Sequence, residues 1–349
     1  MAKVGIFCER GVKFGMGHYS RCSLLARKLV SMGYEVALHC YEDNGGAGDS
    51  SGGDFGAVEV GVAESSPESS AWYAGENLEG YLEGIDWVII DSYQAPYEVY
   101  ARALARVRGV IVIDDIARMV FPSGCIILNG GVDTARLYMG QECKVYAGVE
   151  FMICDERFSE IARAGHRLGH CEGAREAGQN QGAKSERRQV EHLLLCFGGS
   201  DAEDLSYRAY RELEEILCEL GVRRVSVIVG GFYAGRFSHE VETRLPCVVY
   251  RDISAEGVAE VFARSDLAIS AGGRMLNELL LSQVPTLALP IAPNQEHQVA
   301  CYAKMGALLP SRLENLRKDF TRALEFVPDF ALREQFGIKL ESTLKEILC

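Results

Sequence analysis

Short apolar runs alternate with segments of helical periodicity along most of the chain, and this alternation restricts the fold more than any other feature. In the first half, apolar runs lie at 3–8, 35–41, 57–62, 86–91 and 109–115. In the second half, runs at 192–197, 225–229, 247–250, 266–270 and 285–290 repeat the pattern. Strands that alternate with helices form parallel sheets covered on both faces. We therefore predict an α/β chain with two doubly wound parallel sheets.

A polar segment separates the two series. Residues 165–188 are rich in glycine and lack an apolar face, which is typical of a linker. We predict a first Rossmann-like domain at 1–160, a linker at 161–190 and a second Rossmann-like domain at 191–349. Ligands of open α/β sheets bind beyond the carboxyl ends of the strands. We therefore expect the two domains to face each other across a cleft that holds the site.

Composition narrows the class of ligand. A formal net charge of −13 argues against nucleic acid as a partner. The 12 cysteines are scattered without metal-ligand spacing, so we predict reduced thiols, no metal and no other cofactor. No apolar run approaches the ~20 residues of a membrane span, and the chain starts with a strand instead of a signal peptide. We expect a cytoplasmic protein that acts on a small molecule; its oligomeric state is open, and a monomer fits.

The stretch GMGHYSR follows the first strand and opens the first helix. Gly15 and Gly17 permit positive φ and a close approach of the backbone to a ligand. His18 falls in the first helical turn, where the N-terminal field disfavours imidazolium and keeps the ring neutral, as a general base requires. Arg21, one turn on, shares that face and can hold an anionic group. The alternative is a glycine turn followed by a surface histidine.

Two glycine turns in the second half predict a phosphate site. Gly199 and Ser200 follow a strand in CFGGSD, although an ordinary turn with Ser200 or Asp201 as N-cap explains that stretch equally well. In SAGGRMLNELL the turn precedes a helix whose N-terminus can bind a diphosphate. The residues expected there are Gly272, Gly273, Arg274, which adds positive charge, and Glu278, which can accept hydrogen bonds from ribose hydroxyls. The alternative for Glu278 is a solvated helix surface.

Three further strand ends carry polar side chains. Asn294, Gln295 and Gln298 follow the strand at 285–290 and can bind sugar hydroxyls or acyl amides, or else form a loop and N-cap. Tyr93 follows the strand at 86–91, at the expected rim of the cleft. The pair Asp114 and Asp115 lacks the remaining ligands of a metal site, so we interpret Asp115 and Arg118 as structural or substrate-orienting groups.

Taken in order, the motifs GMGHYSR, DSYQ, VIDDIAR, CFGGSD, DLAISAGG with Glu278, and PNQ resemble those of the pseudaminic acid pathway UDP-sugar hydrolases, which are grouped with the spore-coat polysaccharide protein SpsG. The resemblance covers nearly the whole chain. The block from Asp266 to Gln298 also resembles the nucleotide-sugar half of MurG-type glycosyltransferases. Both families share the two-domain GT-B fold, which the resemblance therefore implies here.

The resemblance implies release of UDP from a 2,4-diacetamido-2,4,6-trideoxy hexose without a metal, in nonulosonate or surface-glycan biosynthesis. His18 would activate water against the anomeric carbon, and Tyr93 would support the sugar. Gly199, Ser200, Gly272, Gly273 and Glu278 would hold the nucleotide, and Asn294 would contact the sugar or its phosphate.

Two departures from the family pattern concern the substrate. Family members carry Ser/Thr-rich residues after the double glycine, where this chain has Arg274 to Asn277. An arginine of a family stretch similar to YALLRPEF is replaced by Asp155, and Arg157 follows two residues later. Two alternatives to the hydrolase remain open. One is an inverting GT-B glycosyltransferase that uses a UDP-sugar donor, and the other is a non-catalytic nucleotide-sugar-binding protein.

Overall fold

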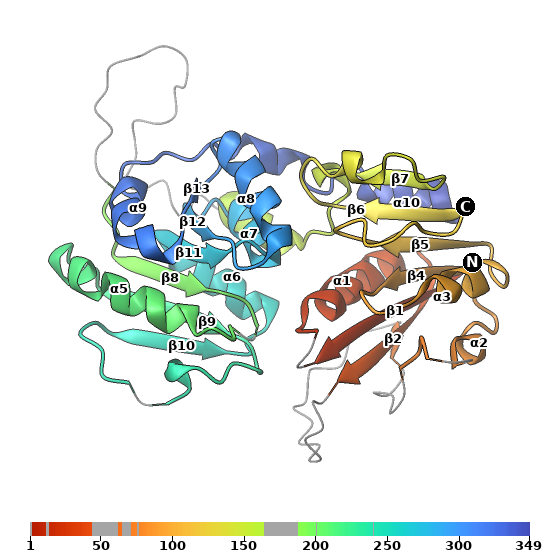
Figure 1. Ribbon diagram of the computed structural model, residues 1–349, viewed down its shortest axis with the longest axis horizontal. Coiled ribbons are helices and arrows are strands. Elements are labelled where there is room, and N and C mark those ends of the chain that lie inside the picture. The colour runs from red at the N-terminus through yellow and green to blue at the C-terminus, as the bar shows by residue number, and fades with distance from the viewer. Residues whose placement is uncertain are drawn as a thin grey trace, which may run out of the picture. The chain divides into compact units, whose positions relative to one another are not determined.

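The computed structural model describes residues 2–11, 14–43, 62–64, 71–74, 77–163, 188–199, 201–239 and 241–349. The chain divides into two compact units (Figure 1). The first comprises Met1–Cys154 and Gln335–Cys349, and the second comprises Asp155–Glu334. Most of the predicted linker, residues 164–187, lies outside the described residues, as does most of the strand predicted at 57–62.

The first unit is built on a seven-stranded parallel sheet with the order β3-β2-β1-β4-β5-β6-β7. Its strands are β1 (Lys3–Gly11), β2 (Glu35–Asp43), β3 (Val62–Glu64), β4 (Trp87–Asp91), β5 (Gly109–Ile113), β6 (Cys125–Asn129) and β7 (Lys144–Ala147). The strand order reverses between β1 and β4, and this switch point is where ligands bind in doubly wound sheets.

Helices cover both faces of this sheet. They are α1 (Gly17–Ser31), α2 (Asn77–Tyr81), α3 (Tyr97–Leu104) and α10 (Leu340–Leu348), with 3₁₀ turns η1 (Ala135–Tyr138) and η2 (Val149–Phe151). Apolar residues of α1 and α10 share one core cluster with β1, and those of α2 and α3 share another with the opposite face.

The second unit contains a six-stranded parallel sheet with the order β10-β9-β8-β11-β12-β13, whose switch point lies between β8 and β11. Its strands are β8 (His192–Cys196), β9 (Arg224–Val229), β10 (Cys247–Arg251), β11 (Leu267–Ala271), β12 (Thr286–Leu289) and β13 (Leu309–Pro310). Its helices are α4 (Glu156–Arg163), α5 (Leu205–Glu219), α6 (Ala255–Arg264), α7 (Arg274–Leu281), α8 (Pro293–Lys304) and α9 (Leu316–Ala323), with 3₁₀ turns η3 (Arg236–Ser238), η4 (Leu313–Asn315) and η5 (Ala331–Gln335). The predicted class, an α/β chain with two doubly wound parallel sheets, is confirmed.

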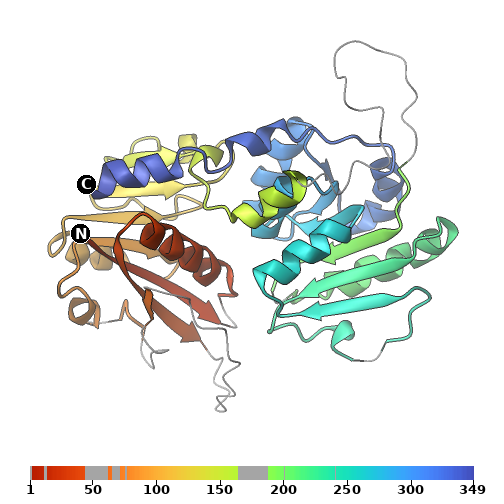
Figure 2. The same ribbon diagram turned by 180° about the vertical axis from the view of Figure 1, so that it is seen from behind.

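The C-terminal helix differs from the expected domain division. The sequence places residues 335–349 in the second domain, whereas the structure assigns Gln335–Cys349 to the first unit. Figure 2 shows this blue helix, α10, beside the yellow strands of that unit. Leu340, Leu344 and Leu348 of α10 are buried in the core formed by β1 and its neighbours, which stabilises the helix there. Periodicity identifies an amphipathic helix but not the sheet that its apolar face covers.

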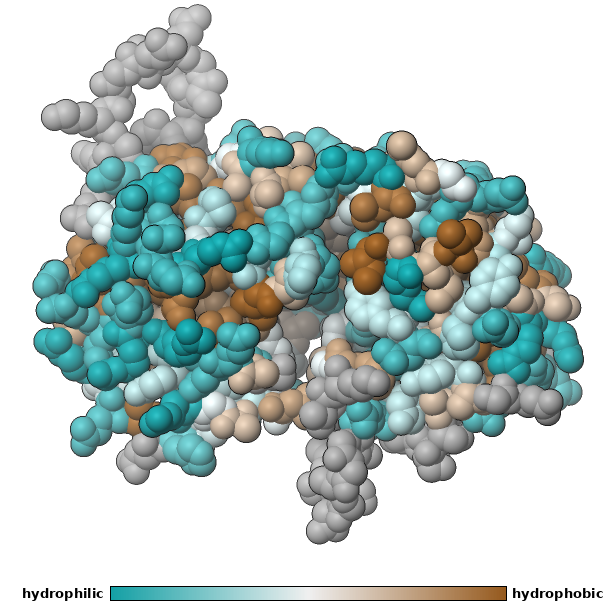
Figure 3. All heavy atoms as spheres, viewed as in Figure 1, coloured by the Kyte–Doolittle hydropathy of each residue, from teal (hydrophilic) through white to brown (hydrophobic). Residues whose placement is uncertain are grey.

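The outer surface is largely hydrophilic on the face shown in Figure 3, where brown hydrophobic residues lie scattered among teal ones. Within the described parts of the chain, we find no helix with the length and apolar character needed to cross a bilayer.

Candidate active site and glycine turns

His18 and Asp91 form a close pair at the switch point of the first sheet. His18 lies in the first turn of α1, just beyond β1, and is only 7% exposed. Asp91 ends β4, beside Cys8 of β1 in the parallel register. The distance from His18 Nδ1 to Asp91 Oδ1 is 2.6 Å. The sequence identified His18 but not its partner; the position of Asp91 at the end of an adjacent strand is the signal that identifies it.

Asp91 determines the state of the imidazole. Burial lowers the pKa of His18, but the charge and hydrogen bond of Asp91 outweigh it, so the pKa of His18 lies above its ordinary value. This corrects the expectation that the helix N-terminus governs the ring, because the carboxylate acts at hydrogen-bond distance. In the neutral ring Nδ1 donates to Asp91, which leaves the lone pair on Nε2 to accept a proton.

Arg21 joins two carboxylates of this site. Its Nε and Nη2 donate to Asp91 at 2.5 and 2.7 Å, and its Nη1 donates to Asp115 at 2.8 Å. The Tyr93 hydroxyl donates to the other oxygen of Asp115 at 3.0 Å, and the Tyr93 ring packs edge-on against His18 with 4.6 Å between centroids. The structure thus brings the candidate residues His18, Arg21 and Tyr93 together. It also uses Arg21 to hold carboxylates within the protein.

The loop from β1 to α1 is closed by its glycines. Gly15 has φ +69°, and its N–H donates to the Gly11 carbonyl at 2.7 Å while the Gly11 N–H donates to Gly15. A side chain at Gly15 would be strained by this φ. A Cβ at Gly15 or at Gly17, which begins α1, meets no atom within 4 Å, so described residues leave open space beside both. The glycines therefore allow a ligand to approach the start of α1.

Asp114 and Arg118 support the surrounding loops. Asp114 Oδ2 accepts hydrogen bonds from the Ala117 N–H at 2.7 Å and from the Tyr138 hydroxyl at 2.7 Å. Arg118 Nη2 donates to the Ala95 carbonyl at 2.7 Å and to the Tyr100 hydroxyl at 2.6 Å. These contacts agree with the structural interpretation of Arg118.

In the second unit, Gly272 and Gly273 form the turn between β11 and α7. A Cβ on Gly272 would lie 2.7 Å from Val299 Cγ2, so only glycine allows α8 to approach this closely. Gln295 Oε1 accepts hydrogen bonds from the N–H groups of Gly272 and Ile291, both at 3.0 Å. Gln295 is expected to bind substrate. Its carbonyl oxygen is occupied by these backbone hydrogen bonds, so only its amide N–H groups are available to a ligand.

Arg274 and Glu278 pair one turn apart on α7. Arg274 Nε donates to Glu278 Oε1 at 3.0 Å, while its Nη1 is buried without a hydrogen-bond partner in the described chain. Burial raises the pKa of Glu278, although the charge of Arg274 opposes this. The expected alternative, a solvated Glu278, does not fit, since its side chain is only 16% exposed.

The turn after β8 has a capping role. Asp201 adopts φ 38° and accepts hydrogen bonds from the N–H groups of Leu205 and Ser206 at 2.8 and 2.9 Å. A Cβ at Gly230 would lie 2.5 Å from the Gly199 carbonyl oxygen, so these two turns pack closely. Ser200, expected to bind phosphate, lies outside the described residues.

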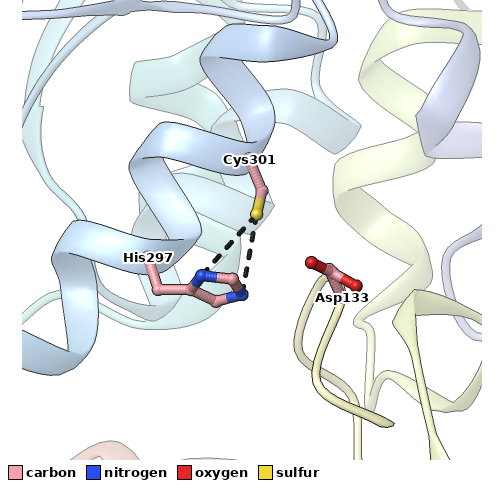
Figure 4. A group of neighbouring side chains, drawn as sticks. All are labelled: Asp133, His297 and Cys301. Carbon is pink, nitrogen blue, oxygen red and sulfur yellow. Dashed lines mark hydrogen bonds between the residues drawn. The ribbon is translucent and has the colours of Figure 1, made fainter. Parts of the chain in front are cut away.

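The remaining candidate residues lie near the starts of α8 and α4. Asn294 is exposed in the first turn of α8. Further along that helix, Cys301 Sγ lies 3.6 Å from His297 Nε2 (Figure 4). Asp155, which replaces the family arginine, lies directly before α4 and accepts hydrogen bonds from Arg157 Nε at 3.0 Å and Nη2 at 2.5 Å.

Comparison with known proteins shows which of them this chain resembles. No family model matches the chain. It is 24% identical over 353 residues to a Helicobacter pylori protein named pseudaminic acid cytidylyltransferase and UDP-2,4-diacetamido-2,4,6-trideoxy-beta-L-altropyranose hydrolase, covering 99% of this chain and 55% of that protein. It is 23% identical to the Bacillus subtilis spore coat polysaccharide biosynthesis protein SpsG, covering 91% of this chain and 86% of SpsG. The chain resembles the pseudaminic acid pathway enzyme and SpsG. It spans about half the length of the H. pylori relative.

Solved structures show the fold of this chain. MurG of Acinetobacter baumannii matches with a TM-score of 0.55 and 14% identity over 100% of this chain and 98% of MurG. The spinosyn rhamnosyltransferase SpnG, solved with thymidine diphosphate, matches with a TM-score of 0.60 and 12% identity over 100% of both chains. The chain therefore has the GT-B fold, and the predicted fold class and resemblance are confirmed.

Proposed function

We propose that the chain is a nucleotide-sugar hydrolase that releases UDP from a UDP-linked 2,4-diacetamido-2,4,6-trideoxy hexose in nonulosonate or surface-glycan biosynthesis. The observation that carries the proposal is the buried His18–Asp91 pair, with a 2.6 Å contact at the switch point of the first sheet. Similarity to the H. pylori protein, whose name includes a hydrolase of this kind, supports the substrate class.

In the proposed reaction, water attacks the anomeric carbon while its proton passes to His18 Nε2. The bond from that carbon to the diphosphate oxygen breaks, and UDP leaves with that oxygen from the opposite face, so the configuration inverts. Asp91 stabilises the imidazolium that forms, since it accepts the Nδ1–H bond. Tyr93 and Arg21 would shape the sugar side of this site together with Gly15 and Gly17.

The nucleotide would bind the second unit. The N–H groups at the start of α7, which has no side-chain cap, suit a diphosphate. Gly199, Ser200, Gly272 and Gly273 would allow its approach; Arg274 would add positive charge, and Glu278 would accept ribose hydroxyls. Asn294 and the amide of Gln295 would contact the sugar or its phosphate.

The test compares UDP release from the candidate nucleotide sugar by the wild type, by His18→Ala and by His239→Ala, a matched control at an exposed histidine. We expect His18→Ala to lose about 10²- to 10⁴-fold in kcat, the usual contribution of a general base, and the control to retain wild-type activity. Undiminished release by His18→Ala would remove the role assigned to that residue.

An inverting glycosyltransferase is the second candidate, because the solved structures with this fold named above are glycosyltransferases. His18 would then deprotonate an acceptor hydroxyl. Incubation with the nucleotide sugar alone separates the two, since a transferase is nearly idle without its acceptor. Thermal stabilisation by UDP with no turnover under either condition would instead indicate a binding protein.

A further inference from the structure

One buried acidic side chain beside the His18–Asp91 pair has no role in the chemistry above. Glu9, on β1, is 0% exposed. Its Oε1 accepts a hydrogen bond from Ser92 Oγ, whereas Oε2 is buried and has no hydrogen-bond partner among the residues that the structure describes. A buried carboxyl group with one unpaired oxygen is costly. Because this carboxyl group destabilises the folded chain, we expect it to have a role beside the His18–Asp91 pair.

The Ser92 hydroxyl fixes the direction of its contact with Glu9. The N–H groups of Gln94 and Ala95 donate to Ser92 Oγ at 3.0 and 2.8 Å. A hydroxyl has two lone pairs and one proton, so that proton must point toward Glu9 Oε1. Any proton carried by Glu9 itself is therefore on Oε2. The Glu9 side chain holds the turn at 92–95 from the neighbouring strand.

This turn carries the side chains that surround the imidazole. It begins directly after Asp91 and contains Tyr93, whose ring packs edge-on against His18. The Tyr93 hydroxyl is tied to Asp115, which also binds Arg21. A shift of the turn would therefore move Asp91 and Tyr93 relative to His18.

The charged groups that face Glu9 come from several elements. His18 on α1, Asp91 on β4 and Arg118 after β5 act on it, and it acts on the phenols of Tyr73 and Tyr100. Burial is the largest effect and raises the pKa of Glu9 to about 7, against the Ser92 hydrogen bond and the nearby positive charges.

The charges of Glu9 and His18 are therefore coupled. A negative Glu9 favours the imidazolium form of His18. Arg118 does not neutralise Glu9 by direct contact, because Glu9 Oε1 is bonded to Ser92 and Oε2 has no hydrogen-bond partner among the described residues.

We propose that Glu9 is a positioning residue of the candidate site: through Ser92 it holds the turn that carries Tyr93, and its charge sets how readily His18 takes up a proton. Glu9 contacts no reacting atom in this scheme and acts through Ser92 and His18. The inference thus rests on the proposed function, but its effect on the imidazole can be measured without substrate.

The first measurement is the pKa of His18 by NMR titration of the full chain labelled with ¹³C-histidine, with the signal assigned by its loss in His18→Gln. Glu9→Gln keeps the shape and an acceptor for Ser92 but removes the charge. We expect it to lower the pKa of His18 by about half a unit or more. Glu98→Gln, the same change at an exposed site on α3, is the matched control, with a shift below about 0.2 units.

The second variant, Ser92→Ala, removes the hydrogen bond that favours ionised Glu9. It should lower the pKa of His18 in the same direction by a smaller amount, and Glu9→Gln with Ser92→Ala should give no shift beyond that of Glu9→Gln. If the chain hydrolyses nucleotide sugars, the acidic limb of kcat/KM moves to lower pH by the amount that NMR measures.

An unchanged His18 pKa in Glu9→Gln overturns the inference, whether or not the protein releases UDP. Should Glu9→Gln fail to fold, the Ser92→Ala titration decides alone: a downward shift supports the role of Glu9, and no shift overturns it. Absence of UDP release by the wild type would count against the proposed function and leave this titration fully informative.

Discussion

Replacing Asp91 by asparagine perturbs the charge balance of the first unit with little change of shape. The Asp91 carboxylate is 0% exposed, accepts hydrogen bonds from His18 and twice from Arg21, and lies 3.6 Å from Cys22 Sγ. Removing one partner of a buried ion pair costs 3–5 kcal/mol as a rule. Arg21 keeps its bond to Asp115, so we expect Asp91→Asn to lower the free energy of unfolding by about 3 kcal/mol, at the lower end of that range.

The same substitution acts on the imidazole. The side-chain amide of an asparagine can donate a hydrogen bond to His18 Nδ1. This favours the tautomer in which Nε2 carries the proton, and in that tautomer Nε2 cannot act as the base. If the proposed function holds, UDP release should fall on the order of 10³-fold. Without the carboxylate, the pKa of His18 should also fall below its wild-type value, because the charge of Asp91 raises it.

Urea unfolding at neutral pH measures the stability, with Asp86→Asn as the matched control before the other end of β4. Asp86 accepts a hydrogen bond from the Lys3 N–H and is partly exposed, so its loss should cost only about 1 kcal/mol. The double variant Asp91→Asn with Arg21→Met should cost less than the sum of the single variants, by 1 kcal/mol or more, since the arginine is then no longer left without its charge partner.

The contribution of Asp91 to stability depends on pH, because only the ionised carboxylate pairs with Arg21. Arg21 and His18 hold the pKa of Asp91 well below its ordinary value of 3.8. This stabilisation is complete above that ordinary value and is lost as the pH falls toward the native pKa. The stability gap between wild type and Asp91→Asn should therefore shrink in acid. A variant within about 1 kcal/mol of wild type at neutral pH, with strictly additive effects in the double variant, would refute the view that Asp91 is the counter-ion of Arg21.

Three other predictions concern single sites. Gly272→Ala should destabilise the second unit by about 1–3 kcal/mol in urea unfolding, because its Cβ would overlap Val299 at 2.7 Å; unchanged stability would mean that α8 shifts freely. In calorimetry, Arg274→Met should weaken UDP binding about tenfold or more and leave uridine binding nearly unchanged. Glu278→Gln should weaken the binding of both ligands. If Arg274→Met weakens both ligands equally, Arg274 makes no phosphate contact. Burial raises the pKa of Glu9 from 4.5 to about 7, so ionisation of Glu9 between these pH values favours the unfolded chain. The free energy of unfolding of Glu9→Gln, measured relative to wild type, should therefore rise by about 3 kcal/mol between pH 4 and pH 8. A difference that stays constant with pH would show that Glu9 has an ordinary pKa.

Local sequence signals were sufficient for the architecture and for the glycine turns at strand ends. Buried strands followed by helices indicated two parallel sheets, and glycines at strand ends marked Gly15 and Gly272 as turns that the structure indeed forms. His18 was identified because its glycine turn opens a helix beyond the first strand. These features depend on residues a few positions apart, which local periodicity and turn chemistry describe well.

The pairing of distant side chains required the tertiary structure. Asp91 meets His18 because β4 lies beside β1, although β2 and β3 come between them in the chain. Gln295 accepts a hydrogen bond from the Gly272 turn, a contact that the sequence did not predict, because α8 packs against that turn. Strand order decides such contacts, and no local pattern encodes it.

The sequence by itself determined the α/β class, the two sheets and the positions of the polar strand ends, because each follows from short-range periodicity and backbone preference. Only the tertiary structure decided which of these ends meet, that Asp91 raises the pKa of His18, and that α10 covers the first sheet. The physical reason is that burial and charge pairing act through space, so their energies depend on which strands and helices become neighbours.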